Sequence, residues 1–232
     1  TTVKLLIINV YQDNDQYQNL VNLVKEFDPD ILLTVESNKA WEEGISAIES
    51  DFSYCKKIPL ENTYGMHFYS KLPVKKIQEH YFLSKERPTI EALLEDPDGT
   101  EFVFWGVHPP PPSPTEETTA KKKNSELMQI AQHIRQAKYT TLVAGDFNNV
   151  CWSKIAKLFA RTAHLIDARK GRGLYSTFPA KYFLLRFPLD LLYHTKGLHI
   201  KSMRTLKNIG SDHLPLYTEF CVEQSNELQR SK

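Results

Sequence analysis

Two polar residues stand two positions apart where an apolar stretch ends in the middle of the chain. Residues 140–144 are mostly β-branched and apolar, which predicts a buried strand, and Gly145 then lets the backbone turn sharply. Asp146 and Asn148 follow, and residues two apart in an extended segment point the same way. They offer an anionic acceptor that can act as a base and an amide that can donate to an oxyanion. The pair is also typical of an Asx turn, so the pattern alone leaves two interpretations.

A second polar motif, Gly210-Ser211-Asp212-His213, favours the catalytic interpretation. Its aspartate follows Asp146 by 66 residues and comes just before the apolar stretch 214–220. Three more residues share the placement of Asp146, each at or just past the end of an apolar run: Asn9, Glu36 and His108. If those strand ends meet at one rim, they gather carboxylates, amides and imidazoles. That mixture is suited to the hydrolysis of phosphate esters.

These motifs resemble the endonuclease/exonuclease/phosphatase superfamily, which includes deoxyribonuclease I, abasic-site endonucleases, neutral sphingomyelinases and inositol-phosphate 5-phosphatases. The resemblance runs from about Lys4 to Phe220. Besides Gly145-Asp146-Phe147-Asn148 and Ser211-Asp212-His213, matches follow in the expected order at residues 6–10, 29–36, 64–66, 70–73, 107–109 and 189–192. The prolines after His108 and the motif Pro188-Leu189-Asp190 are most similar to a bacterial branch whose substrates are poorly defined.

The resemblance implies a metal end and a water-activating end for the site. Glu36 and Asp212 are hard oxygen donors suited to Mg²⁺ or Mn²⁺, and Asn9 either adds a carbonyl ligand or orients Glu36. Asp146 is expected to orient and deprotonate the attacking water, and Asn148 to donate to a phosphate oxygen. A carboxylate of ordinary pKa is a weak base, so this role calls for a pKa of Asp146 raised by burial or by a neighbouring carboxylate.

Two histidines complete the expected site. His213 is expected to hydrogen-bond the phosphate, while Asp190, a charge inside an apolar run that needs a partner, holds its ring through the other nitrogen. His108 matches a phosphate-contacting histidine of the deoxyribonuclease-like members, and Tyr64 is a weaker candidate. Two departures bear on substrate contacts: Leu191 follows Asp190 in place of a histidine or tyrosine, and Lys123 is the basic residue expected near Asn124. The other histidines are interpreted as structural: His67, His80, His133, His164, His194 and His199.

Composition predicts one large domain. The chain has 232 residues, 41% of them hydrophobic and 25% charged, which is ordinary for a globular soluble protein. We expect a catalytic domain over residues 1–222, acting as a monomer, and a polar tail over residues 223–232. The net charge of +1 provides no global basic field to attract nucleic acid. Cys55, Cys151 and Cys221 lack metal-ligand spacing and are interpreted as small core residues.

The order of the predicted elements indicates the fold. Helices are expected at residues 20–27, capped from residues 13–15, at 41–48, after a capping box at Ser113, and at 152–159. The predicted strands are 3–10, 31–35, 52–58, 65–70, 74–82, 89–94, 102–107, 140–144, 189–193, 199–205 and 214–220. We find no internal repeat. This order favours an α/β fold of two packed, mainly antiparallel sheets flanked by helices, the four-layer αββα sandwich that the resemblance also implies.

The expected activity is Mg²⁺-dependent hydrolysis of a phosphoester, with nucleic acid, phospholipid and small phosphate ester open as substrates. The alternative is a non-catalytic binding module on the same fold, which would predict broken motifs.

Residues 121–123, three lysines, are interpreted as a solvated helix face. Residues 181–187 are either an apolar substrate lip or membrane contact, or a strand with its turn. No stretch reaches the ~18 apolar residues of a bilayer span. We expect a soluble domain, and membrane helices often precede it in the branch that it resembles.

Overall fold

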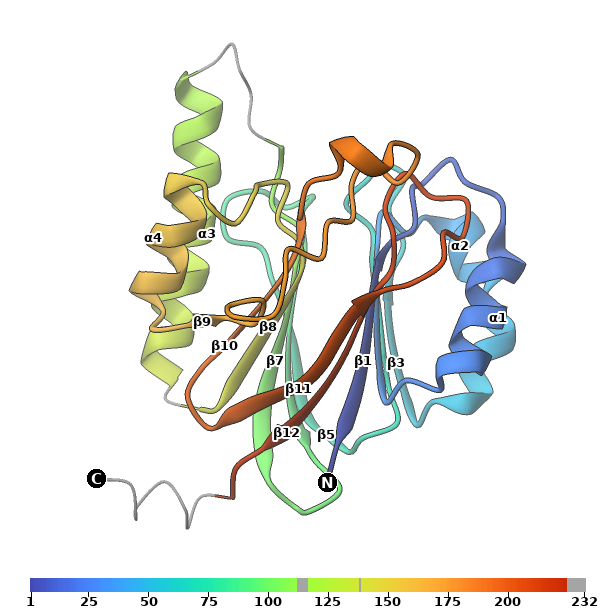
Figure 1. The fold of residues 1–232 in the computed structure, drawn as a ribbon, viewed down its shortest axis with the longest axis horizontal. Coiled ribbons are helices and arrows are strands. Elements are labelled where there is room, and N and C mark those ends of the chain that lie inside the picture. The colour runs from blue at the N-terminus through green and yellow to red at the C-terminus, as the bar shows by residue number, and fades with distance from the viewer. Residues whose placement is uncertain (112–116, 138, 225–232) are drawn as a thin grey trace.

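The computed structural model describes residues 1–111, 117–137 and 139–224, with the backbone alone over residues 117–124. The capping box expected at Ser113, the side chains of the lysines at 121–123 and the tail beyond residue 224 lie outside this description. The described residues form two six-stranded sheets packed face to face, with helices on both outer faces (Figure 1). The predicted αββα sandwich is therefore confirmed.

The first sheet has the strand order β11-β12-β1-β2-β4-β3. The second has the order β5-β6-β7-β8-β10-β9. In each sheet one central pair is parallel, β1 with β2 and β7 with β8, and the other pairings are antiparallel. The strands of the first sheet are β1 (Val3–Asn9), β2 (Ile31–Val35), β3 (Tyr54–Ile58), β4 (Met66–Ser70), β11 (Leu198–Thr205) and β12 (Leu216–Val222). Those of the second are β5 (Val74–His80), β6 (Thr89–Glu95), β7 (Glu101–Val107), β8 (Thr141–Asp146), β9 (Ile166–Asp167) and β10 (Asp190–His194).

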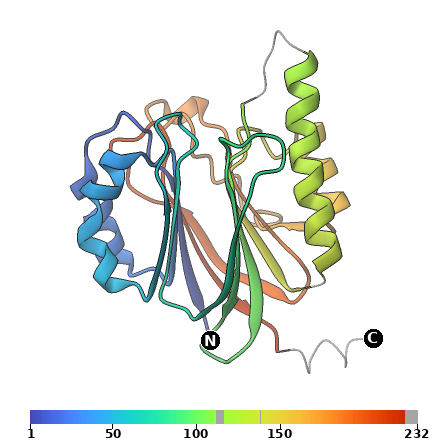
Figure 2. The ribbon, with the colours of Figure 1, turned by 180° about the vertical axis from the view of Figure 1, so that it is seen from behind.

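The helices cover the two sheets from outside, as the opposite views in Figures 1 and 2 show. The first sheet is covered by α1 (Tyr17–Phe27), α2 (Lys39–Gly44) and the 3-10 helix η1 (Ser46–Asp51). The second is covered by α3 (Glu117–Ala137) and α4 (Lys154–Thr162). Among the described residues, no helix combines the length and the apolar character needed to cross a bilayer.

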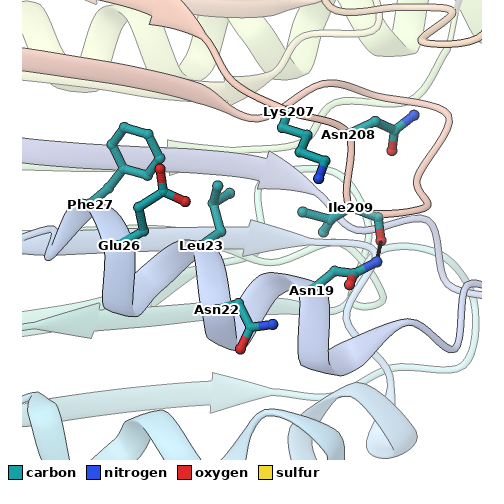
Figure 3. A pocket seen from close by; sticks show the side chains of 8 residues that line it. All are labelled: Asn19, Asn22, Leu23, Glu26, Phe27, Lys207, Asn208 and Ile209. Carbon is teal, nitrogen blue, oxygen red and sulfur yellow. Dashed lines mark hydrogen bonds between the residues drawn. The ribbon is translucent and has the colours of Figure 1, made fainter.

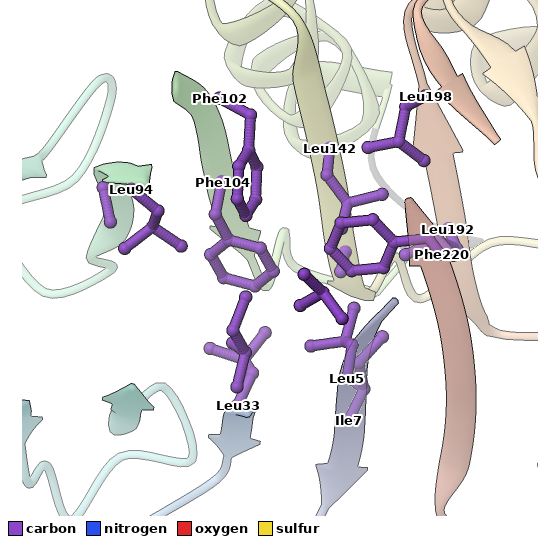
Figure 4. Packing of buried hydrophobic residues seen from close by; sticks show 14 of the residues in the cluster. Leu5, Ile7, Leu33, Leu94, Phe102, Phe104, Leu142, Leu192, Leu198 and Phe220 are labelled. Atoms are coloured by element: carbon purple, nitrogen blue, oxygen red, sulfur yellow. The ribbon is translucent and has the colours of Figure 1, made fainter. Parts of the chain in front are cut away.

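The main core lies between the two sheets. Phe102 and Phe104 of β7 and Leu142 of β8 point toward Leu5 of β1 and Leu33 of β2 (Figure 4), and all five are fully buried. Burying a side chain of this size contributes about 1.5–3 kcal/mol, so this layer fixes how the sheets face each other. Further apolar clusters lie between the first sheet and α1, α2 and η1, and between the second sheet and α3 and α4.

Several local predictions were wrong. Helix α1 begins after Gln16, whose side chain makes no capping hydrogen bond, because Asn14 instead accepts from the backbone N–H of Gln16. The second predicted helix is divided at Ile45 into α2 and η1. For residues 181–187 two interpretations were open, and the one that is wrong is the strand, because these residues contain the 3-10 helix η2 (Phe183–Leu185). The three cysteines are free thiols that are only half buried, so they are not fully core residues.

The two parallel pairs bring the polar strand ends together. Asn9, the last residue of β1, pairs with Val35 of β2, and Val107 of β7 pairs with Gly145 of β8. The amide of Asn9 donates to the carboxylate of Asp146 across the two sheets, which shows that both pairs end at the same rim. This rim is the upper edge of the molecule in Figure 1, where β1 and β8 end.

Candidate active site

All eight predicted site residues lie at this rim. Asn9 ends β1, Glu36 follows β2, His108 follows β7, and Asp146 ends β8. Asp190 begins β10, Asp212 and His213 precede β12, and Asn148 lies two residues beyond β8. The side chains differ in burial. Asn9, His108, Asp146, Asp190 and His213 are buried, Glu36 and Asn148 are half buried, and Asp212 is exposed.

Backbone conformations that most residues avoid hold three of these side chains in place. Gly145 has φ +147°, and a Cβ there would stand 1.9 Å from the carbonyl oxygen of Val107. Only glycine fits, so β8 can bring Asp146 tight against the end of β7. Glu36 and Asn148 have φ values of +62° and +49°, in the left-handed region. Such strained residues concentrate at functional sites.

The Asn9 amide joins two carboxylates. Its Nδ2 donates to Glu36 Oε1 at 2.8 Å and to Asp146 Oδ2 at 3.0 Å. Its Oδ1 accepts from the backbone N–H of Tyr11 at 2.9 Å, which fixes the orientation of the amide. The hydroxyl of Ser211 donates to the backbone oxygen of Asn9 at 2.7 Å. Asn9 is thus arranged to orient Glu36, the second of the two roles expected for it.

His213 lies between two buried carboxylates. Its Nδ1 is 2.7 Å from Asp190 Oδ2, and its Nε2 is 3.6 Å from Asp146 Oδ2. Burial by itself disfavours the charged ring, but the carboxylates of Asp190 and Asp146 outweigh it and raise the pKa of His213 to about 10. The ring is therefore a cation at neutral pH, with its Nδ1–H donated to Asp190.

Asp146 differs from the expectation in the direction of its pKa. Burial alone would raise that pKa, but the imidazoles of His213 and His108 lower it below its usual value. His108 Nε2 lies 3.9 Å from Asp146 Oδ2. The carboxyl group with a raised pKa is Glu36, first because burial disfavours its charge and then because Asp146 and Asp212 repel it, although the Asn9 amide partly opposes this. Asp146 is therefore a firmly ionised acceptor.

Asn148 makes the hydrogen bond of an Asx turn and a second contact at the cavity wall. Its backbone N–H donates to Asp146 Oδ1 at 2.7 Å, which is the hydrogen bond of an Asx turn. Its side-chain Nδ2 donates to the backbone oxygen of Pro109 at 3.0 Å, which holds the amide at the cavity wall.

Five of the predicted residues line one open cavity of about 490 Å³. Its walls include Glu36, Asp146, Asn148, Asp212 and His213, with apolar surface from Val150, Phe178 and Leu189. Asn9 and Asp190 lie beneath it and hold the lining residues. A second depression of about 260 Å³ lies between α1 and residues 207–209, lined mainly by amide and aliphatic side chains (Figure 3). The carboxylates and imidazoles described above do not line that second depression.

Sequence reasoning missed the role of three residues near the site. The Phe178 ring stands 4.8 Å from the His213 ring, and no motif marks it, since it lies in an irregular segment. Ser211 accepts from the His213 backbone N–H at 3.0 Å, a contact that its place in the Gly-Ser-Asp-His motif could have suggested. Arg87 lies over the ring of Tyr64, whose centroid is 5.3 Å from that of His108.

Two of the histidines interpreted as structural form a separate cluster. His80 Nε2 is 2.6 Å from Glu91 Oε2, and His133 Nε2 is 4.0 Å from the same oxygen. The cluster lies where α3 covers the second sheet, packed on Trp105. His67 is buried within β4, and burial lowers its pKa to about 4. His194 is also buried, with its Nδ1 2.9 Å from the backbone oxygen of Thr195.

The donor set at the rim fits a hard divalent cation. Ligand atoms of Glu36, His108 and Asp146 lie within 4.8 Å of one another, and the exposed carboxylate of Asp212 lines the same cavity. Carboxylate oxygens are the ligands that Mg²⁺ and Mn²⁺ prefer. Burial raises the pKa of Glu36, and the carboxylates of Asp146 and Asp212 add to this, so a bound cation would favour its charged form.

A two-sheet sandwich with carboxylates and imidazoles gathered where its central strands end is the architecture of the αββα phosphoester hydrolases. The chain belongs to the endonuclease/exonuclease/phosphatase family, whose family model matches residues 7–213. This family defines the class of reaction as hydrolysis of phosphoester bonds, and its members generally depend on a divalent metal.

Several solved structures share the fold. The catalytic domain of human Nocturnin with bound sulfate is 20% identical with a TM-score of 0.77, over 95% of this chain and 94% of that one. TDP2 of D. rerio, complexed with a single-strand DNA product, is 15% identical with a TM-score of 0.79, over 96% and 100%. A mannosyl-6-phosphatase of Bacteroides thetaiotaomicron VPI-5482 is 15% identical with a TM-score of 0.71, over 94% and 99%. Comparison with curated protein sequences gives no significant match.

Proposed function

We propose that this chain is a Mg²⁺- or Mn²⁺-dependent hydrolase of phosphoester bonds. The observation that carries the proposal is the position of one oxygen, Asp146 Oδ2. It accepts from Asn9 at 3.0 Å and lies 3.6 and 3.9 Å from the Nε2 atoms of His213 and His108. Asp146 is thus an anion at the cavity wall, close to the protonated ring of His213 and to the carboxylate of Glu36. Together these groups can orient water, hold a phosphate and bind a cation, as phosphoester hydrolysis requires.

Glu36 and Asp212 would hold the ion, with the Asn9 amide fixing the orientation of Glu36. The bound cation supplies charge neutralisation for the phosphoryl oxygens and the leaving group. Asp146 accepts a hydrogen bond from the attacking water and directs its lone pair toward phosphorus. Because its pKa is lowered, Asp146 serves first to orient the water and accepts its proton as the new P–O bond forms. The bond from phosphorus to the leaving oxygen breaks at the same time, and the leaving oxygen departs with the electron pair, whose charge the cation would neutralise.

The imidazoles and the amide hold the phosphate. His213, protonated at neutral pH, donates its Nε2–H to a phosphate oxygen while Asp190 keeps the ring in position. His108 and Asn148 contact further phosphate oxygens from the ends of β7 and β8. Each donor acts where charge increases as the transition state forms, so each stabilises it more than the ground state.

We favour a lipid or small phosphoester over duplex nucleic acid as the substrate. Affinity for a duplex depends on contacts to several phosphates, and this chain has a net charge of only +1. Lys181 and Arg186 stand on the loop between β9 and β10, while the side chains of the lysines at 121–123 lie outside the described residues. DNA cleavage, where it occurs, should be weak and should change little with salt.

A hydrolysis screen with and without Mg²⁺ tests the proposal. It compares plasmid DNA, single-stranded DNA, RNA, sphingomyelin and phosphoinositides, with Asp146→Asn as the matched inactive variant. Metal-dependent turnover of any of these that Asp146→Asn loses supports the proposal. Binding without turnover on every substrate would instead favour a non-catalytic binding module. Efficient, steeply salt-dependent nicking of plasmid with no action on lipid or small esters would overturn the substrate preference.

A further inference from the structure

The loop between β9 and β10 exposes apolar side chains to an unusual degree. Leu184 is 90% exposed, Phe183 76% and Leu185 63%, and Tyr182 beside them is more than half exposed. A contiguous exposed group of this kind marks an interaction surface, because single exposed apolar residues are common but clusters of them are not. We name residues 182–185 the apolar turn.

We propose that the apolar turn inserts into the surface of a phospholipid bilayer that contains anionic lipid, and so brings the Asp146 cavity to the phospholipid headgroups. Insertion depends on the apolar turn alone. Hydrolysis of the phospholipid headgroups rests on the proposed phosphoesterase function.

The backbone of the apolar turn is closed on itself. The N–H of Leu185 donates to the Tyr182 carbonyl oxygen at 3.0 Å, and the N–H of Tyr182 donates to the Pro179 carbonyl oxygen at 3.2 Å. At its base, the N–H groups of Thr177 and Phe178 both donate to the Phe187 carbonyl oxygen. Backbone groups that enter an apolar medium need internal partners, and the N–H groups of Tyr182 and Leu185 already have them.

The loop that carries the apolar turn is bonded to the proposed active site. The N–H of Ala180 donates to the carbonyl oxygen of Asp212 at 2.7 Å, and that of Leu214 donates to the Thr177 carbonyl oxygen at 3.0 Å. Phe178 lines the cavity and packs on the His213 ring. In Figure 1 the apolar turn is the orange segment above the rim, on the side where the strand ends meet. Docking of this turn therefore sets the position of the cavity relative to the surface that it enters.

The positive charge of the loop favours an anionic lipid surface as the partner. Residues 168–189 contain no aspartate or glutamate, and the cations Lys181 and Arg186 flank the apolar turn on either side. Lys181 lies over the Tyr182 ring at 5.4 Å, and Arg186 over the Phe183 ring at 5.4 Å. Aliphatic and aromatic side chains at an apex with basic residues at its base are the composition of a bilayer interface. The basic residues would then meet anionic headgroups while Phe183 and Leu184 enter the acyl region.

Flotation with lipid vesicles tests the proposal directly. The whole chain is mixed with vesicles of phosphatidylcholine, with or without phosphatidylglycerol. We expect wild type to float with the mixed vesicles and more weakly with phosphatidylcholine alone. The double variant Phe183→Ser/Leu184→Ser should bind at least about tenfold more weakly, since it removes two of the apolar side chains that would enter the acyl region. Lys181→Glu should weaken binding only to the anionic vesicles.

The matched controls lie at the opposite end of β8. Tyr139→Ser removes an exposed aromatic side chain, and Lys196→Glu reverses an exposed charge beside it. Both should bind vesicles as wild type does. As a second measurement, the indole of Leu184→Trp should shift its emission to the blue on addition of vesicles. Absence of wild-type flotation with both vesicle types, equal binding by Phe183→Ser/Leu184→Ser, or an unshifted Leu184→Trp spectrum would overturn the proposal.

Two further comparisons separate this proposal from the proposed function. Asp146→Asn should bind vesicles like wild type, because insertion does not need turnover. Phe183→Ser/Leu184→Ser should hydrolyse a soluble chromogenic phosphodiester at the wild-type rate but act more slowly on vesicle phospholipid. A wild type that floats yet hydrolyses no phosphoester would leave the insertion intact and overturn the enzyme assignment. Loss of single-stranded DNA binding in Lys181→Glu, with no vesicle binding by wild type, would assign the loop to nucleic acid instead.

Discussion

Asp146 and Asp190 are direct cross-strand partners on β8 and β10, and both carboxylates are buried. Like charges opposite each other in a sheet destabilise it. The ring of His213 lies between them, with Nδ1 2.7 Å from Asp190 Oδ2 and Nε2 3.6 Å from Asp146 Oδ2. A protonated His213 ring therefore offsets the repulsion between the two carboxylates, so its charge contributes to the fold as well as to the site.

The first prediction concerns that charge. Nitrogen-15 NMR of the metal-free protein should show the His213 ring protonated at pH 8, with titration near its pKa of about 10. Because the Asp190 carboxylate favours the cation, Asp190→Asn should lower this pKa by about one unit or more. Turnover of wild type should fall as pH rises through the raised pKa, and in Asp190→Asn it should fall at lower pH. A His213 titration unchanged by the substitution would show that the two residues are uncoupled.

Asp146→Asn should keep the fold and lower turnover by about 10²-fold or more, the usual scale for a positioned base. The amide is similar in size to the carboxylate, but it cannot accept a proton from the attacking water. Steady-state kinetics measures the effect, and Asp13→Asn, an exposed acid between β1 and α1, is the matched control. Near-normal turnover in Asp146→Asn would make Asp146 a structural residue.

Metal binding should depend on Glu36. Calorimetric titration of Mg²⁺ should show at least about tenfold weaker binding to Glu36→Gln than to wild type, because the amide removes the charge that faces the ion. Asn9→Ala should weaken binding to a smaller extent, since it removes the group that orients Glu36. Glu86→Gln, an exposed acid, serves as the control. Equal Mg²⁺ affinity in wild type and Glu36→Gln would remove the residue from the metal site.

His67 should make the protein sensitive to acid without any part in catalysis. Burial lowers its pKa from 6.5 to about 4, so the unfolded state binds the proton more readily. Above pH 6.5 His67 is neutral in both states, and the free energy of unfolding keeps its full value. As pH falls toward 4, the unfolded state takes up a proton and the free energy of unfolding falls by about 3 kcal/mol. Urea unfolding at several pH values should show a shallower loss over this window in His67→Gln than in wild type. Parallel stability curves for the two proteins would contradict this account.

The sequence predicted where the chemistry lies but not how its groups affect one another. The placement of Asn9, Glu36, Asp146 and His213 at strand ends was readable, because apolar runs mark the strands and polar residues end them. The lowered pKa of Asp146 was not readable, since it depends on two imidazoles brought from positions far apart in the chain. Loops were the least predictable part. Residues 181–187 contain a β-like apolar pattern, yet only Phe187 pairs, in an isolated bridge with Phe178, and residues 183–185 form an exposed 3-10 helix.

The sheet orders contain a symmetry that the sequence conceals. The strands can be counted in chain order from β11, continuing from β12 to β1. The first six are then β11, β12, β1, β2, β3 and β4, and the next six are β5 to β10. Each strand of the first set has the same place in its sheet as the corresponding strand of the second set. In both sets a helix joins the parallel pair, α1 in one and α3 in the other. Glu36 and Asp146 each follow the last residue of the parallel pairing, so they are equivalent positions in the two halves. The two acids of the proposed site therefore occupy matching places in the two sheets. Their surroundings act in opposite directions, because the imidazoles of His213 and His108 lower the pKa of Asp146 whereas burial raises the pKa of Glu36.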